Sequence, residues 1–245
     1  MSFDAASLVL VGLIFLWTGF VRTGLGFGGA ALGLPLMLLL GGSPVYWLPI
    51  IGLHLLFFSS LTLFKSIKKV DWHYLQRSLL WIIPPTLIGV AGLLSLPDVV
   101  VIVFIYLITI FYAITWIFDH KITSHKPWVD KFLLIIGGYV AGTSLTGAPL
   151  IVAVYMRHVA KDYLRNTLFV LWFLLVSIKM IAFLAMDVMI DWQFSLALIP
   201  IAAVGHVIGI KAHQKIIEND QLFKQWVGGA LLLISSFGLS KLFLS

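Results

Sequence analysis

The sequence predicts an all-α polytopic membrane protein in which two inverted repeats each consist of a re-entrant helical hairpin and three transmembrane helices. Three observations predict this fold: the composition, the lengths of the apolar segments, and a glycine-containing signature that occurs once in each half. Hydrophobic residues make up 61% of the 245 residues and charged residues 11%, with a mean hydropathy of +1.07. Soluble domains carry about 25% charged residues, so this chain has too few to cover a water-soluble fold.

The charge and the cysteine content exclude several kinds of partner. The net charge is +6, but the lysines and arginines lie mostly in short loops between apolar segments, where they set the orientation against the cytoplasmic leaflet. No nucleic-acid partner is therefore predicted. The chain has no cysteine, which excludes disulfides and thiolate metal sites, and we expect no metal and no cofactor. The N-terminal segment lacks a basic n-region and is interpreted as a retained span.

Apolar segments account for most of the chain. Many have about the 20 residues needed to cross a bilayer, but 131–142 and 147–157 have about half that length. Segments 5–21 and 25–41 are also on the short side. In chain order, the apolar segments fall at 5–21, 25–41, 45–64, 78–96, 98–118, 131–142, 147–157, 166–186, 192–210 and 225–244.

Basic residues indicate how these segments are oriented. They gather in three loops that we expect on the cytoplasmic side, at 65–77, 121–131 and 211–224. The connections without basic residues, expected outside, are 95–98 and 187–191. Between Lys131 and Arg157 the chain leaves and regains the cytoplasmic face, so this stretch is predicted to form a re-entrant hairpin, with two thin spans as the alternative. Residues 5–41 are predicted to form the matching hairpin from the outside.

Two motifs recur at a nearly constant spacing. The signature GFVRTGLGFGGA at 19–30 is matched 119 positions later by GYVAGTSLTGAP at 138–149. The pair Asp71-Trp72 is matched 120 positions later by Asp191-Trp192. Three crossings follow each hairpin, and because three is odd the two halves have opposite orientations. We therefore predict a single membrane domain, 1–245, with one repeat at about 1–120 and the other at about 128–245.

With these motifs the sequence resembles the TauE/SafE family of sulfite and organic-anion exporters, the TSUP permeases, over essentially the whole chain. The resemblance rests on the signatures Gly19–Pro35 and Gly138–Pro149 and on the two Asp-Trp starts. It implies a multi-pass permease of the cell inner membrane for a small sulfur-containing or carboxylate anion, and it leaves a homodimer open. The second signature departs from the glycine pattern, because Thr143, Leu145 and Ala148 stand where the first has glycine.

The hairpin tips are the predicted binding site. Unpaired backbone at mid-membrane depth is tolerated only where it is buried in protein or lines a wet cavity, and helix N-termini placed there attract anions. The alternative is that the glycines serve only close helix packing. The candidate substrate-binding residues are Arg22, Thr23, Gly24, Gly26, Gly28, Gly142, Thr143, Ser144, Thr146 and Gly147.

Arg22 is the strongest single candidate. At a hairpin tip it would lie deep in the membrane, where an arginine usually has a partner or a function. Its planar guanidinium group can donate two hydrogen bonds to a sulfonate or a carboxylate. The alternative is an arginine that snorkels to an interface. Further polar residues inside spans are candidates for a proton or charge relay, with histidine packing and lysine snorkelling as the alternatives: His54, Lys179 and His206. No acidic residue falls in mid-span, which favours an anion as the substrate.

Three other functions are weighed against an alternating-access permease. A passive anion channel would share these features. An intramembrane enzyme is not predicted, because there is no HExxH motif and Leu145 follows Gly142-Thr143-Ser144 where a serine nucleophile turn would need glycine. A membrane assembly factor would not need duplicated mid-membrane turns. The coupling ion and the direction of transport are left open.

Overall fold

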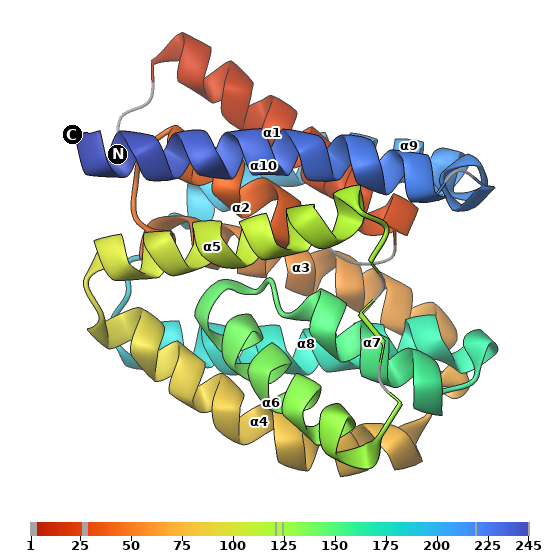
Figure 1. Cartoon of the computed structure of the whole chain (residues 1–245). Coiled ribbons are helices and arrows are strands. Elements are labelled where there is room, and N and C mark those ends of the chain that lie inside the picture. Colours follow the sequence, from red (N-terminus) through yellow and green to blue (C-terminus); the bar gives the residue numbers. More distant parts are fainter. Residues whose placement is uncertain (1–3, 26–28, 121, 124, 219, 245) are drawn as a thin grey trace. The chain divides into compact units, whose positions relative to one another are not determined.

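The computed structural model describes residues 4–25, 29–120, 122–123, 125–218 and 220–244. In this part of the chain all regular structure is helical, as predicted (Figure 1). A single 3₁₀ turn, Ile67–Lys69, follows the third helix. The α-helices are α1 (Ala5–Leu25), α2 (Gly29–Leu39), α3 (Pro44–Ser66), α4 (Trp72–Ser95), α5 (Asp98–Ile117), α6 (Pro127–Ser144), α7 (Ala148–His158), α8 (Lys161–Ala185), α9 (Trp192–Glu218) and α10 (Asp220–Leu244).

Seven of the described helices are long and apolar enough to cross a membrane: α1, α3, α4, α5, α8, α9 and α10. Together with the composition, this makes the chain a multi-pass membrane protein. The two predicted hairpins correspond to α1–α2 and α6–α7. Their second arms, α2 and α7, are short, with 11 residues each.

The first arms of the hairpins are longer than predicted. α1 has 21 residues, and α6 has 18 where the sequence suggested a helix over 131–142 only. The prediction stopped at Lys131 because charges begin there. Pro127 occupies the first turn of α6, where its missing N–H costs nothing, and Asp130 in the same turn is favoured by the positive end of the helix dipole. The charged residues Asp130 and Lys131 are therefore compatible with the first turns of α6.

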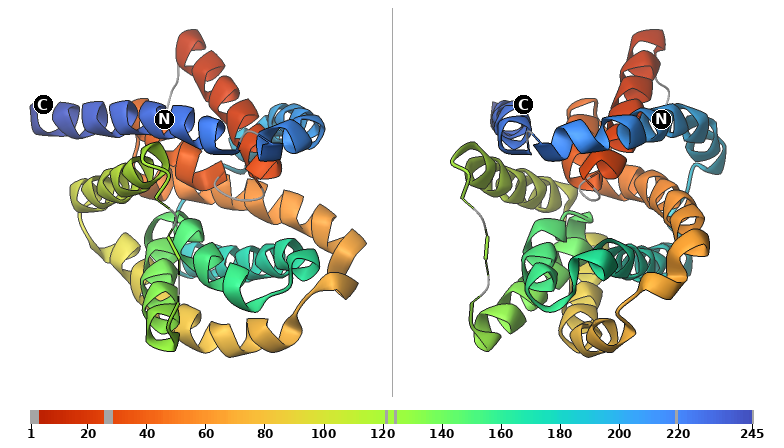
Figure 2. Two further views of the ribbon diagram at one scale, coloured as in Figure 1. Left: turned by 45° about the vertical axis from the view of Figure 1, so that its right-hand side comes forward. Right: turned by 90° about the vertical axis from the view of Figure 1, so that its right-hand side faces the viewer.

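The chain divides into two compact units. Unit 1 contains 1–47, 96–121 and 191–245, and unit 2 contains 48–95 and 122–190. Neither unit coincides with a predicted repeat, because each takes helices from both halves of the sequence. In unit 1 the hairpin α1–α2 packs against α9, and α5 pairs with α10. In unit 2 the hairpin α6–α7 packs against α4, with α8 alongside (Figure 2).

Close packing inside each unit runs through glycines. In unit 1, a methyl group at Gly19 would collide with the carbonyl oxygen of Ala202, where α1 crosses α9. In unit 2, a methyl group at Gly138 would lie 2.6 Å from the carbonyl oxygen of Ile82, where α6 crosses α4. Backbones that approach this closely are typical of small-residue contacts between membrane helices. These glycines of the two signatures are therefore packing residues.

The two Asp-Trp pairs begin helices, as predicted. Asp71 Oδ1 accepts a hydrogen bond from the N–H of Tyr74 at 2.9 Å, and Asp191 Oδ1 accepts one from the N–H of Phe194 at 3.0 Å. Both aspartates are thus N-caps, which satisfy a first-turn N–H that has no partner within the helix. The recurrence of the motif has this structural cause.

Candidate functional site

The tip of the second hairpin is a short turn between α6 and α7. Leu145 adopts a left-handed conformation with φ of 60° and donates its N–H to the carbonyl of Ala141, which ends α6. The tip is buried: Ser144 and Thr146 have no exposed surface. α7 then begins at Ala148, with Gly147 as its N-cap and no side-chain hydrogen bond to the cap. The start of α7 is therefore a buried helix N-terminus that no side chain caps.

The hydroxyl groups of this tip are engaged within the protein. Thr143 Oγ1 donates to the carbonyl of Tyr139 at 2.9 Å, and Ser144 Oγ donates to that of Val140 at 2.9 Å. Ser144 Oγ and Thr146 Oγ1 lie 2.6 Å apart. Because the proton of Ser144 points to its helix, Thr146 is the donor in this pair. The hydroxyls thus order the tip. Pro149 has no N–H, so the first-turn donors of α7 that face no helix carbonyl are the N–H groups of Ala148 and Leu150.

Gly142 and Gly147 have packing roles as well. A methyl group at Gly142 would collide with the carbonyl oxygen of Thr86, and one at Gly147 would collide with that of Gly137 and lie 2.8 Å from the N atom of Ala141. Gly142 lets α6 cross α4, and Gly147 lets α7 start against α6. The packing interpretation of these two candidates has direct support in the structure.

At the first hairpin, Arg22 and Thr23 lie within α1 rather than on the turn that was expected to carry them. Both are buried, Arg22 with 8% and Thr23 with 3% of its surface exposed. Gly24 is also part of α1, while Gly26 and Gly28 lie outside the described residues. A methyl group at Gly29, the first residue of α2, would lie 3.1 Å from Arg22 Cβ. The start of α2 therefore sits directly against Arg22.

The structure joins one predicted binding residue to one predicted relay residue. Thr23 Oγ1 lies 2.5 Å from Nδ1 of His206 on α9, and it also donates to the carbonyl of Gly19 at 3.1 Å. His54, on α3, and Lys179, on α8, belong to unit 2 and are buried with 3% and 1% of their surface exposed. The three relay candidates are thus divided between the units: His206 belongs to unit 1, and His54 and Lys179 belong to unit 2.

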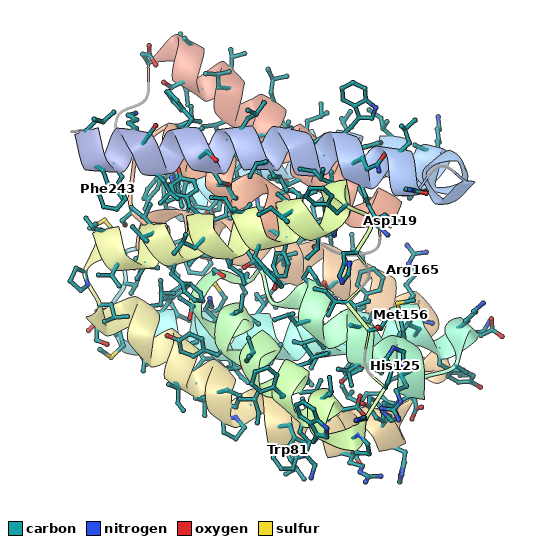
Figure 3. All side chains as sticks on the ribbon, in the orientation of Figure 1. Trp81, Asp119, His125, Met156, Arg165 and Phe243 are labelled. Atoms are coloured by element: carbon teal, nitrogen blue, oxygen red, sulfur yellow. The ribbon has the colours of Figure 1, made fainter. Side chains whose placement is uncertain are left out.

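A charged cluster at the base of the second hairpin was missed at the level of sequence. Asp130, which is buried, accepts hydrogen bonds from Arg157 Nη1 at 3.0 Å and from His158 Nε2 at 2.8 Å. The ring of Tyr74 stacks on His158 with centroids 4.9 Å apart. Met156, labelled in Figure 3, belongs to the same last turn of α7.

The missed cluster had a signal in the sequence. Asp130 and Arg157 looked like loop charges that orient the chain. A hairpin, however, brings its two ends together, so an acid at the start of its first arm meets basic residues at the end of its second arm. The cluster joins the start of α6 to the end of α7 and so holds the two arms of the hairpin together.

Comparison with known proteins assigns the family. The family model described as Sulfite exporter TauE/SafE matches residues 11–237, nearly the whole chain. No curated protein and no solved structure matches the chain. Proteins of this family are transporters and not enzymes, which removes the intramembrane enzyme from the alternatives. With its membrane-spanning helices and its glycine-containing hairpins, the chain belongs to the TauE/SafE sulfite exporter family of membrane transporters.

Proposed function

We propose that the protein is a permease of the cell inner membrane that moves a small anion, such as sulfite, an organosulfonate or a small carboxylate, by alternating access between two inverted repeats. One observation carries this proposal. The short arms α2 and α7 begin at 29 and 148 and end at 39 and 158, so both ends are displaced by 119 positions.

Contacts and burial inside the two units also support the repeat. The contact of Gly19 with Ala202 in unit 1 has its counterpart in the contact of Gly138 with Ile82 in unit 2, displaced by 119 and 120 positions. The order of buried and exposed residues over 72–80 recurs residue by residue over 192–200. Along the chain, α3, α4 and α5 come between the two hairpins. Because three is an odd number of crossings, the second half is inverted relative to the first.

The anion binds, in this proposal, at the hairpin tips. The first turns of α2 and α7 present N–H groups and the positive end of the helix dipole at positions buried within the membrane domain. At the first hairpin, Arg22 is packed against the start of α2, and its guanidinium group can bind two oxygens of an anion at that tip. Rocking of one repeat relative to the other opens the site to each side in turn. The proposal includes no resident cofactor.

Transport in proteoliposomes tests this function. The purified protein is reconstituted, and uptake of labelled sulfite, methanesulfonate, acetate and thiosulfate is measured against protein-free vesicles. We expect uptake of at least one of these anions, and faster uptake when the vesicles are preloaded with the same unlabelled anion. Uptake without this acceleration, together with a steady anion conductance, would establish the passive channel instead. No uptake of any of the four anions would refute the proposed substrate class.

A further inference from the structure

Lys179 is a buried cation whose counter-charge is not found in unit 2. Its side chain is 1% exposed, and its Nζ atom has no hydrogen-bond partner among the described residues. The acidic residues of unit 2 lie at helix ends, and the ion pairs within the described part of the chain are both made by Asp130. A charge inside a membrane protein without a partner is costly and usually serves a ligand. Snorkelling does not explain Lys179, because its ammonium group is itself buried.

The face of α8 that carries Lys179 contributes to an apolar core that α8 shares with α4 and the second hairpin. Leu171 and Leu175 belong to the apolar core that also contains Ile151 and Tyr155 of α7. Lys179 follows these leucines by eight and four positions, so the three side chains lie on one face of the helix. Trp172 lies on the same face, seven positions before Lys179, and its Nε1 is also buried without a partner among the described residues. Two unsatisfied donors therefore occur along one stripe.

Lys179 lies farther along α8 than the start of α7, by about 11 Å, or two helical turns. α7 and α8 contact each other and are joined by two residues, Val159 and Ala160, and α8 passes behind α6 and α7 in Figure 1. At about 1.5 Å per residue, α7 is about 16 Å long and Lys179 lies about 27 Å from the start of α8. A helical lysine leans back toward the N-terminus of its helix, and an anion binds beyond the N-terminus of α7. Both shifts bring the ammonium group and the anion toward the same level.

We infer that Lys179 is the counter-charge for a small oxyanion bound at the N-terminal end of α7. The first-turn N–H groups of α7 hold the oxygens of the anion, and the ammonium group of Lys179 neutralises its charge from α8. This inference rests on the proposed function, but it assigns the second hairpin its own cation on a neighbouring helix, whereas the first hairpin carries Arg22 within its own arm. In each of the two hairpins, the N-terminus of the short arm then has one buried basic residue of its own unit.

The test compares Lys179→Met with the parent and with Lys131→Met, an exposed lysine on α6 in the same unit. Sulfite binding is read as the shift of the thermal midpoint of the purified protein, since a ligand that binds the folded state stabilises it. We expect the apparent affinity of Lys179→Met for sulfite to fall at least tenfold, while Lys131→Met behaves as the parent. Without sulfite, the midpoint of Lys179→Met should equal or exceed that of the parent, because an apolar residue replaces an uncompensated buried charge.

A chemical rescue separates charge from packing. Because the parent has no cysteine, Lys179→Cys introduces a single thiol, and alkylation with 2-bromoethylamine converts it to a thioether amine of nearly lysine length. Alkylation with bromoethane gives an uncharged product, and mass spectrometry confirms both modifications. We expect the amine, but not the ethyl group, to restore the sulfite-dependent shift.

The outcomes that overturn the inference are distinct from those that overturn the function. If Lys179→Met keeps the sulfite-dependent shift of the parent, or if the fully aminoethylated protein binds no better than the ethylated one, Lys179 is not the counter-charge, and the proposed function stands. If the parent itself neither shifts nor transports with any of the four anions, the proposed function fails and the inference fails with it.

Discussion

At the scale of single residues, the structure shows internal contacts for several residues that the sequence presented as candidates for binding. Glycines, hydroxyls and an arginine coincided in the two signatures, and all were candidates for binding. Gly142 and Gly147 have backbone atoms where a Cβ would stand, and the hydroxyls of Thr143 and Ser144 bond to carbonyls of their own helix. Such contacts depend on which helix crosses which, so the sequence alone could not distinguish them from contacts to a ligand.

Arg22 gives the first prediction at this scale. Arg22→Lys should weaken sulfite binding although the charge is kept, because the bidentate fork is lost. Arg22→Ala should weaken it more, by ~1.5–3 kcal/mol, the usual value of a hydrogen bond to a charged group. Titration of the thermal shift with sulfite measures both variants. Parent-like binding and transport in Arg22→Ala would show that the arginine only packs between α1 and α2.

Gly147 gives the second prediction at this scale. Gly147→Ala should lower the thermal midpoint, because its Cβ meets the backbone of Gly137 and Ala141, which cannot move without shifting α6. We expect a loss of about 1–3 kcal/mol, as for other overpacked sites. Gly229→Ala on α10 is the matched control, since a Cβ there has nothing within 4 Å and alanine favours a helix. Equal midpoints for the two variants would refute the packing role of Gly147.

At the scale of elements, most helices could be predicted from the length of apolar segments and from charge, and their ends less well. The Asp-Trp pairs predicted the starts of α4 and α9 because aspartate is a good N-cap. The start of α6 was misplaced, because Asp130 and Lys131 were taken for loop residues although they belong to its first turns. The ion pair between Asp130 and Arg157 was missed for the same reason.

The ion pair between Asp130 and Arg157 leads to a prediction for the hairpin α6–α7. Asp130→Asn and Arg157→Gln should each lower the thermal midpoint, and the double variant should lose less than the sum of the two. We expect a coupling of about 0.5–3 kcal/mol from the double-mutant cycle, toward the low end because the Arg157 side chain is 33% exposed. Additive losses would mean that the ion pair does not hold the two arms together.

At the scale of the whole molecule, the family, the membrane class and the helical fold could be predicted from the sequence, whereas the pairing of the helices could not. Hydropathy identifies segments but says nothing of their neighbours. The packing of α9 on the first hairpin and of α4 on the second joins residues far apart in the chain. Lys179 shows the same limit: its position inside a span was visible, but its burial without a partner was not.

The central claim is that the two halves of the chain are inverted relative to each other, and topology mapping tests it most directly. His73 and Gln193 are both exposed, and each follows one of the Asp-Trp helix starts, 120 positions apart. Each is replaced by cysteine in the cysteine-free chain, and intact cells are treated with a membrane-impermeant maleimide. The account predicts that Gln193→Cys is labelled in intact cells and His73→Cys only after permeabilisation. Labelling of both variants from the same side would contradict the inverted repeat.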